Sequence, residues 1–154
     1  MDKTYGTIII GLGSWNGDDR VGWSLVEWLC KRRKPFAPAF ALEEPTRIID
    51  YLDGCEHLVI IDACLSGAEP GTIFRLTWPD SRLDQLRCES SHSFSLGATL
   101  RLAEQLGTLP SRVVIYAVEV GQCHCTSKLS KEVKRALPKL KQRVLRESIE
   151  ATHA

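Results

Sequence analysis

The sequence lacks a charge imbalance, a long apolar run and any internal repeat. Its 154 residues carry 20 basic and 19 acidic side chains, a formal net charge of +1. This balance provides no general electrostatic attraction to nucleic acid or to an anionic membrane surface. No apolar stretch approaches the roughly 20 residues of a membrane-spanning helix. The opening MDKTYGTIII lacks the features of a secretory signal peptide. We therefore expect a cytoplasmic protein that binds neither nucleic acid nor membrane.

The cysteines show no regular framework that would indicate disulfides. They are Cys30, Cys55, Cys64, Cys88, Cys123 and Cys125. Free thiols are expected for such cysteines in a reducing compartment. In the segment GQCHCTS (121–127), Cys123, His124 and Cys125 are too close together to chelate one ion well. We interpret that segment as a reduced surface loop.

Short apolar runs alternate with helical patterns along the chain. The composition, 44% hydrophobic and 25% charged, fits one domain over residues 1–154 with its own core. Strands are predicted at 7–10, 39–42, 58–61, 72–77 and 113–118, and helices from 21, 45, 93 and 130 onward. This order predicts an α/β fold, a three-layer sandwich. Helices would cover both faces of a mostly parallel twisted sheet of about five strands.

Ligands of such sheets bind beyond the carboxyl ends of the strands. This rule selects three segments of the chain. The first is the loop GLGSWNGDDRVG (11–22), which follows the first predicted strand. The second is the turn that begins at Asp62, where the run LVII ends, and the third is the helix start near His92.

The glycines of the first loop suggest a phosphate cradle, but their spacing argues against one. A dinucleotide loop requires G-x-G-x-x-G, and here Gly11 and Gly13 are followed by Asn16 at the third position. Asp18 and Asp19 stand where the helix N-terminus would meet phosphate, and their charges would repel it. We therefore expect the loop to face a cation.

Each acidic or basic candidate also has an ordinary structural explanation. Aspartate is a favoured helix cap, and we assign that role to Asp18. A buried Asp62 would be costly unless paired, and the following turn ACLSGAEPG offers hydrogen bonds to it. His92 alone suits a capping or surface position. Together, however, Asp19, Asp62 and His92 offer two carboxylates and one imidazole, a set that suits a divalent transition metal with open coordination positions.

At these residues the sequence resembles the [NiFe]-hydrogenase maturation proteases, endopeptidases that trim the C-terminus of the hydrogenase large subunit. Four segments match the family pattern in order over residues 6–148. They are IIIGLGSWNGDDRVGWSLVEWL, HLVIIDACLSGAEPGTIFRL, SSHSFSLGATLRLAEQLG and VVIYAVEVG with the following LSKEVKRAL. No single segment is unique, but their order and spacing together are specific.

The resemblance implies an aspartic-type endopeptidase whose catalytic and metal-binding residues are Asp19, Asp62 and His92. Asp19 is preferred to Asp18 because it lies three residues before Gly22, as the family acid does before its glycine. The implied metal is nickel already inserted in the large-subunit precursor, so we expect no organic cofactor. The precursor is the expected partner, and nothing demands an oligomer, so we expect a monomer. Either the metal polarises the scissile carbonyl or activates water, or an aspartate acts as general base.

Departures from the family pattern leave two other hypotheses open. Ser14 replaces the usual asparagine, the loop before Gly22 is one residue short, and LEEPT (42–46) stands where the family has D-G-G-T. With this altered segment, the protein would bind metal or a hydrogenase subunit without cutting. A third hypothesis is a thiol hydrolase with Cys64 as nucleophile and His92 as base. The ordinary explanation of Cys64 is a small buried residue.

Overall fold

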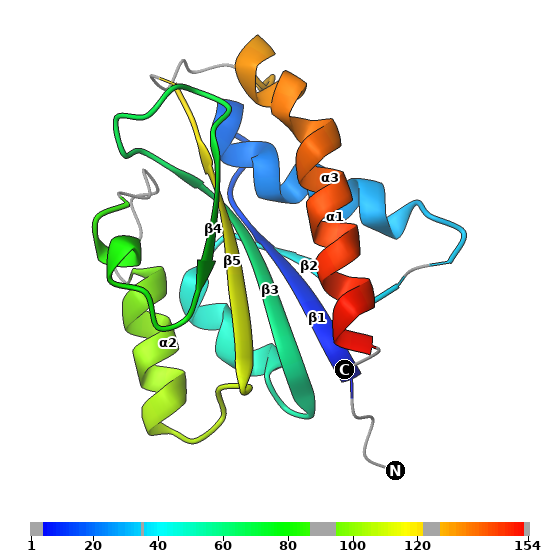
Figure 1. The fold of residues 1–154 in the computed structure, drawn as a ribbon, viewed down its shortest axis with the longest axis vertical. Coiled ribbons are helices and arrows are strands. Elements are labelled where there is room, and N and C mark those ends of the chain that lie inside the picture. The colour runs from blue at the N-terminus through cyan, green and yellow to red at the C-terminus, as the bar shows by residue number, and fades with distance from the viewer. Residues whose placement is uncertain (1–4, 35, 87–94, 122–126, 153–154) are drawn as a thin grey trace.

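The computed structural model describes residues 5–34, 36–86, 95–121 and 127–152. Five strands form one twisted sheet in the order β2-β1-β3-β5-β4 (Figure 1). They are β1 (Tyr5–Leu12), β2 (Ala39–Leu42), β3 (Cys55–Cys64), β4 (Ile73–Thr77) and β5 (Arg112–Glu119). Neighbouring strands are parallel except for β4, which lies antiparallel to β5 at one edge. The predicted α/β fold with a mostly parallel sheet is confirmed.

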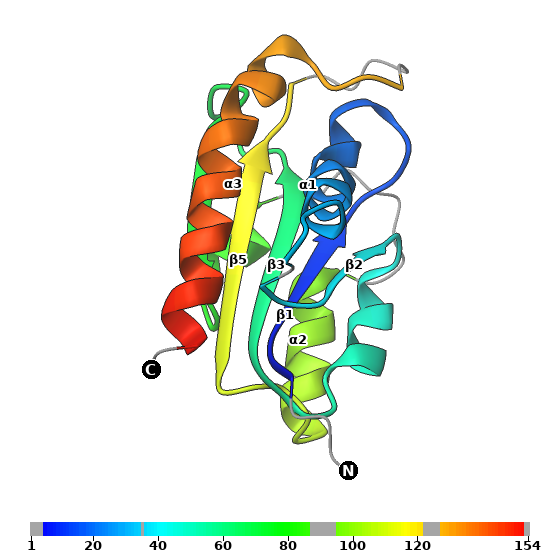
Figure 2. The ribbon, with the colours of Figure 1, turned by 90° about the vertical axis from the view of Figure 1, so that its right-hand side faces the viewer.

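Helices cover both faces of this sheet. Figure 2 shows α1 (Val21–Cys30) and α3 (Lys131–Thr152) on one face and α2 (Leu96–Gln105) on the other. Three short 3₁₀ helices, η1 (Gly17–Arg20), η2 (Pro45–Tyr51) and η3 (Ser81–Asp84), complete the connections. None of the described helices combines the length and apolarity needed to cross a membrane.

The central strands are apolar on both faces because each face has its own helical layer. Successive side chains of a strand point to opposite sides. In β3, Leu58 and Ile60 pack with α2 and η2, whereas Val59 and Ile61 pack with α1 and α3. These four residues are fully buried. The unbroken run LVII is therefore the sequence of a strand that is covered twice.

Several element boundaries differ from the predictions, and two of them lie near the predicted site. The strand expected to end at Asp62 continues to Cys64, because β5 pairs alongside it as far as Glu119. The helix expected from Ser93 begins at Leu96, because Ser95 is extended and its hydroxyl accepts the N–H of Ala98 as the N-cap. The first difference comes from a neighbouring strand, and the second comes from a local helix cap.

The order of the strands creates a switch point between β1 and β3. The chain leaves β1 through α1 on one face to reach β2, and returns through η2 on the other face to β3. Connections that diverge from neighbouring parallel strands open a crevice at the carboxyl ends of those strands. Of the predicted site segments, the glycine loop follows β1, and the turn that begins at Asp62 stands at the end of β3.

Candidate functional site

The loop after β1 and the end of β3 meet at this switch point. Gly11 of β1 is paired with Ile61 of β3, so Asp62 lies one position beyond the pair at the carboxyl edge. Alternation along β3 places Asp62 on the face of α2, with only 6% of its surface exposed. Asp19 lies in η1, the short helix that follows the loop and contacts β3. Both predicted aspartates therefore belong to one edge of the sheet.

Glycines allow this close approach of helix and sheet. A Cβ at Gly22 would lie 2.5 Å from the carbonyl oxygen of Leu12 and 2.8 Å from that of Ile61. A Cβ at Gly11 would in turn collide with the carbonyl oxygen of Gly22. The glycines thus bring the start of α1 against the ends of β1 and β3, as interior packing leaves no room for even one methyl group. These glycines therefore serve the close packing of helix and sheet rather than the binding of a phosphate group.

The backbone of the loop fixes Asp19 while leaving its carboxylate available. The N–H of Asp19 donates to Asn16 at 3.1 Å, and its carbonyl accepts the N–H of Ser14 at 3.4 Å. The residue is half-buried. Among the described residues its side chain has no hydrogen-bond or ion-pair partner. A half-buried carboxylate held in this way is suited to bind a cation supplied from outside.

Asp18 does not cap the helix that follows it, contrary to the prediction. No side chain caps η1 or α1. Instead the Asp18 Oδ1 atom accepts the backbone N–H of Ser130 at 2.6 Å. Ser130 in turn caps α3, since its hydroxyl accepts the N–H of Val133 at 3.3 Å. Asp18 therefore joins the loop of the candidate site to the start of α3.

Asp62 and Glu119 both accept hydrogen bonds from the turn after β3. The Asp62 Oδ1 atom accepts the N–H of its neighbour Ala63 at 2.8 Å. Glu119, 1% exposed at the end of β5, accepts the N–H and the hydroxyl of Ser66 and the N–H of Gly67 at 2.6–3.2 Å. Glu119 was not among the site residues predicted from the sequence, although an acid inside the apolar run VVIYAVEV was a visible signal.

The surroundings of Cys64 argue against a thiol nucleophile. Its side chain is 1% exposed, and its thiol donates to the Glu119 carboxylate at 3.6 Å. Burial raises the pKa of the Cys64 thiol strongly, and the negative charges of Glu119 and Asp62 raise it further. A reactive cysteine requires the opposite, an exposed and positive environment that lowers the pKa. Cys64 is a buried small residue of the core.

The third predicted site residue, His92, lies outside the described residues, as do Cys88 and the segment Cys123–Cys125. The described chain resumes at Ser95, three residues after His92 and at the start of α2. Within the described part of the chain, no three histidine, cysteine or acidic side chains are grouped closely enough to hold a metal. The proposed set of two carboxylates and one imidazole therefore stays a prediction.

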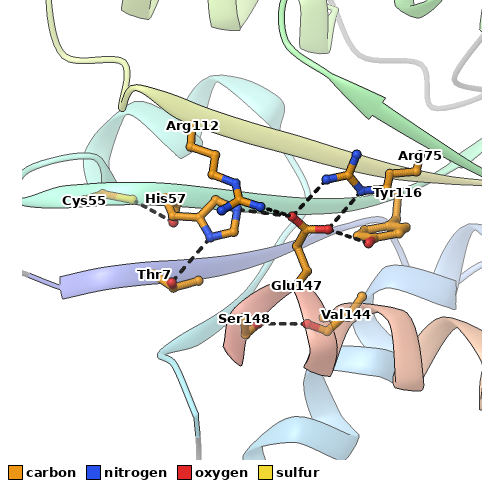
Figure 3. A network of polar contacts seen from close by, with 9 residues as sticks. All are labelled: Thr7, Cys55, His57, Arg75, Arg112, Tyr116, Val144, Glu147 and Ser148. Atoms are coloured by element: carbon orange, nitrogen blue, oxygen red, sulfur yellow. Dashed lines mark hydrogen bonds and ion pairs between the residues drawn. The ribbon is translucent and has the colours of Figure 1, made fainter. Parts of the chain in front are cut away.

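A second polar cluster, shown in Figure 3, lies at the opposite end of the sheet around Glu147 of α3. The Glu147 carboxylate accepts two hydrogen bonds from Arg75, one from Arg112 and one from Tyr116, all at 2.8–3.0 Å. Burial acts to raise the pKa of Glu147, but these partners outweigh it and lower the pKa. His57 lies 3.8 Å away, and burial and Arg112 lower its pKa. The neutral imidazole forms no ion pair there.

This Glu147 cluster has the properties of a structural anchor. Its carboxylate is buried and satisfied by side chains of β4 and β5. Burial, followed by the hydrogen bond to Glu147, raises the pKa of Tyr116 to about 12, so its hydroxyl remains a donor. The cluster fastens the last turns of α3 to the sheet. The carboxyl edge, where the Asp19 carboxylate has no partner among the described residues, is the better candidate for chemistry.

Comparison with family models decides the class of protein. The model of the hydrogenase maturation proteases matches residues 43–147. The chain belongs to the hydrogenase maturation protease family. The matched region includes Asp62 and the position of His92, whereas Asp19 precedes it. A search of curated protein sequences finds no match.

Solved structures show that members of this family share the fold. The maturating endopeptidase HybD from E. coli matches with a TM-score of 0.78 and 21% identity, over 95% of this chain and 93% of its own. The [NiFe] hydrogenase maturation protease HybD from Thermococcus kodakarensis matches with a TM-score of 0.75 and 21% identity, over 93% and 99%. An endopeptidase from Escherichia coli matches at 0.71 and 24%, over 93% of both chains.

Proposed function

We propose that this family member is an endopeptidase that removes the C-terminal extension of a [NiFe]-hydrogenase large-subunit precursor after nickel insertion. The observation that carries the proposal is the family match over residues 43–147, joined to the position of Asp19 and Asp62 at one edge of the sheet. Members of the family act on such precursors. Cys30, Cys55 and Cys64 are free thiols, the usual form of cysteine in the reducing cytoplasm, where we propose that the protein acts.

In this proposal the nickel belongs to the substrate. Asp19 and Asp62, together with His92, bind the nickel that the precursor already carries. Carboxylate oxygens and one imidazole form an open set that precursor ligands complete. The protease thereby recognises that the hydrogenase active site is loaded. A precursor without nickel lacks the cation that offsets the repulsion between two carboxylates, so it binds poorly.

The scissile bond is cut by water, for which the site offers an aspartate as general base. The Asp62 carboxylate is well placed because its backbone lies within β3 and Ala63 orients one of its oxygens. The base takes a proton from water as the hydroxide adds to the scissile carbonyl, and the proton passes to the leaving amine. Alternatively, nickel held by Asp19, Asp62 and His92 would polarise that carbonyl or lower the pKa of the water.

The test is incubation of the protein with nickel-loaded and nickel-free precursor, followed on a denaturing gel and by native gel shift. We expect shortening of the nickel-loaded precursor alone. A stable complex with a precursor of unchanged length would instead support the non-cleaving module suggested by the altered LEEPT segment. Equal shortening of both precursors would contradict recognition through nickel.

A further inference from the structure

Trp15 is exposed to a degree that folding does not explain. Its side chain is 65% exposed, more than any other large hydrophobic residue among those that the structure describes. An indole is one of the largest sources of burial energy available to a protein. Beside a candidate site, an exposed tryptophan is a residue type that often carries the binding energy of an interface. Leu106, at 59%, is similarly exposed but follows α2 at the opposite end of the sheet.

Neighbouring side chains hold the Trp15 ring in place. Its ring meets Trp23 edge to face, with the centroids 5.0 Å apart and the planes at 89°. Trp23 is itself fixed, since its indole N–H donates to the carbonyl of Leu42 at 3.0 Å. The guanidinium of Arg20 lies 4.9 Å from the Trp15 centroid. A ring supported in this way has already lost much of its freedom, so a partner binds it at lower entropic cost.

Trp15 and the candidate aspartate share one closed loop. The hydrogen bonds of Asp19 to Ser14 and Asn16 enclose the position of Trp15. Arg20 follows Asp19 directly and donates to the carbonyl of Ser127 at 3.4 Å. A surface of one aromatic ring and one cation therefore adjoins the carboxylate that is proposed to meet nickel. Ser127 takes one of the five N–H donors of the guanidinium in a hydrogen bond within the described residues, and a guanidinium can pair with an incoming carboxylate.

We propose that Trp15, supported by Trp23 and Arg20, is a substrate-anchoring residue that binds the large-subunit precursor beside the site. The inference rests on the proposed function. The segment it fits is an extended peptide that places an apolar side chain on the indole and a carboxylate against Arg20. Aromatic residues at the centre of a contact commonly provide most of its affinity. The loop thus serves both for metal recognition and for positioning of the peptide.

The test compares Trp15→Ala and Trp15→Phe with Leu106→Ala as the matched exposed control. Initial rates of cleavage are measured against the concentration of nickel-loaded precursor, and binding is measured by fluorescence anisotropy of labelled precursor. We expect Trp15→Ala to raise KM and Kd at least tenfold with kcat within about twofold. Trp15→Phe should recover part of the loss, and Leu106→Ala should match the wild type.

Two results would overturn the anchoring role of Trp15 while leaving the proposed function intact. One is an unchanged KM and Kd in Trp15→Ala, and another is a fall in kcat alone. A precursor that wild type binds without cutting would refute the endopeptidase, and the Kd of Trp15→Ala would still decide the anchoring role. If wild type neither binds nor cuts the precursor, both proposals fail.

Discussion

Replacing Glu119 with alanine removes the carboxylate that holds the turn after β3. That carboxylate accepts hydrogen bonds from both polar groups of Ser66, from the N–H of Gly67 and from the thiol of Cys64. The backbone of Glu119 also bonds the far end of the same turn, at Gly71 and Thr72. Only the side-chain contacts are lost in Glu119→Ala. The expected effect is therefore a loosened turn on an intact sheet.

The cost follows from the number and kind of donors left behind. A hydrogen bond to a charged group contributes about 1.5–3 kcal/mol. The two backbone donors, on Ser66 and Gly67, lie on an exposed turn where water replaces part of the loss, so the lower end of that range applies. Glu119→Ala should then lose about 3 kcal/mol, or about 6–12 °C in Tm for a domain of this size. Glu119→Gln retains one acceptor oxygen and should lose about half as much.

Urea unfolding followed by far-UV circular dichroism measures this loss through the shift in midpoint at constant slope. Glu104→Ala, which removes an exposed acid from α2, is the matched control and should lie within about 0.5 kcal/mol of wild type. A loss of less than about 1 kcal/mol in Glu119→Ala would refute the role of Glu119 in holding the turn.

Three further predictions test the packing and the surroundings of the site. Gly22→Ala adds a methyl group against two backbone carbonyls and should cost about 1–3 kcal/mol in urea unfolding, whereas Gly6→Ala, which has open space, should cost nothing measurable. Burial, the largest cause, lowers the pKa of His57, so the unfolded chain binds more protons. The free energy of unfolding should therefore fall as pH drops below about 6.5, and His57→Gln should flatten that slope between pH 5 and 7. Cys64→Ser should cut the precursor at the wild-type rate, because the thiol is buried, and a large loss of rate without unfolding would restore the thiol hydrolase hypothesis.

Local sequence patterns predicted the elements of the sheet well. The run AFAL at 39–42 is a strand with those bounds, and the alternating run before Thr77 is the edge strand β4. Both are edge strands of the sheet and are only partly covered, and their apolar and β-branched residues were a sufficient local signal. The carboxyl-edge rule then selected the loop of Asp19 and the position of Asp62 without a structure.

The errors at the carboxyl edge come from contact between distant parts of the chain. Asp18 satisfies every local rule for a helix cap, yet it binds Ser130, 112 residues away. Asp62 accepts the first N–H of the turn, as expected, but the N–H groups of Ser66 and Gly67 bind Glu119, a second buried acid that β5 brings to the same edge. Trp15 carried no periodic signal, since its exposure depends on the folded loop. Patterns within one element cannot report such partners.

The most direct test of the central claim is the intact mass of nickel-loaded precursor after incubation with wild type, Asp62→Asn and His92→Ala. Asp53→Asn, an exposed acid remote from the carboxyl edge, is the control. The account predicts a single cut by wild type and by Asp53→Asn, and at least a hundredfold slower cleavage by the two site variants, as expected for loss of a proposed base or metal ligand. Cleavage at the wild-type rate by both site variants would contradict it.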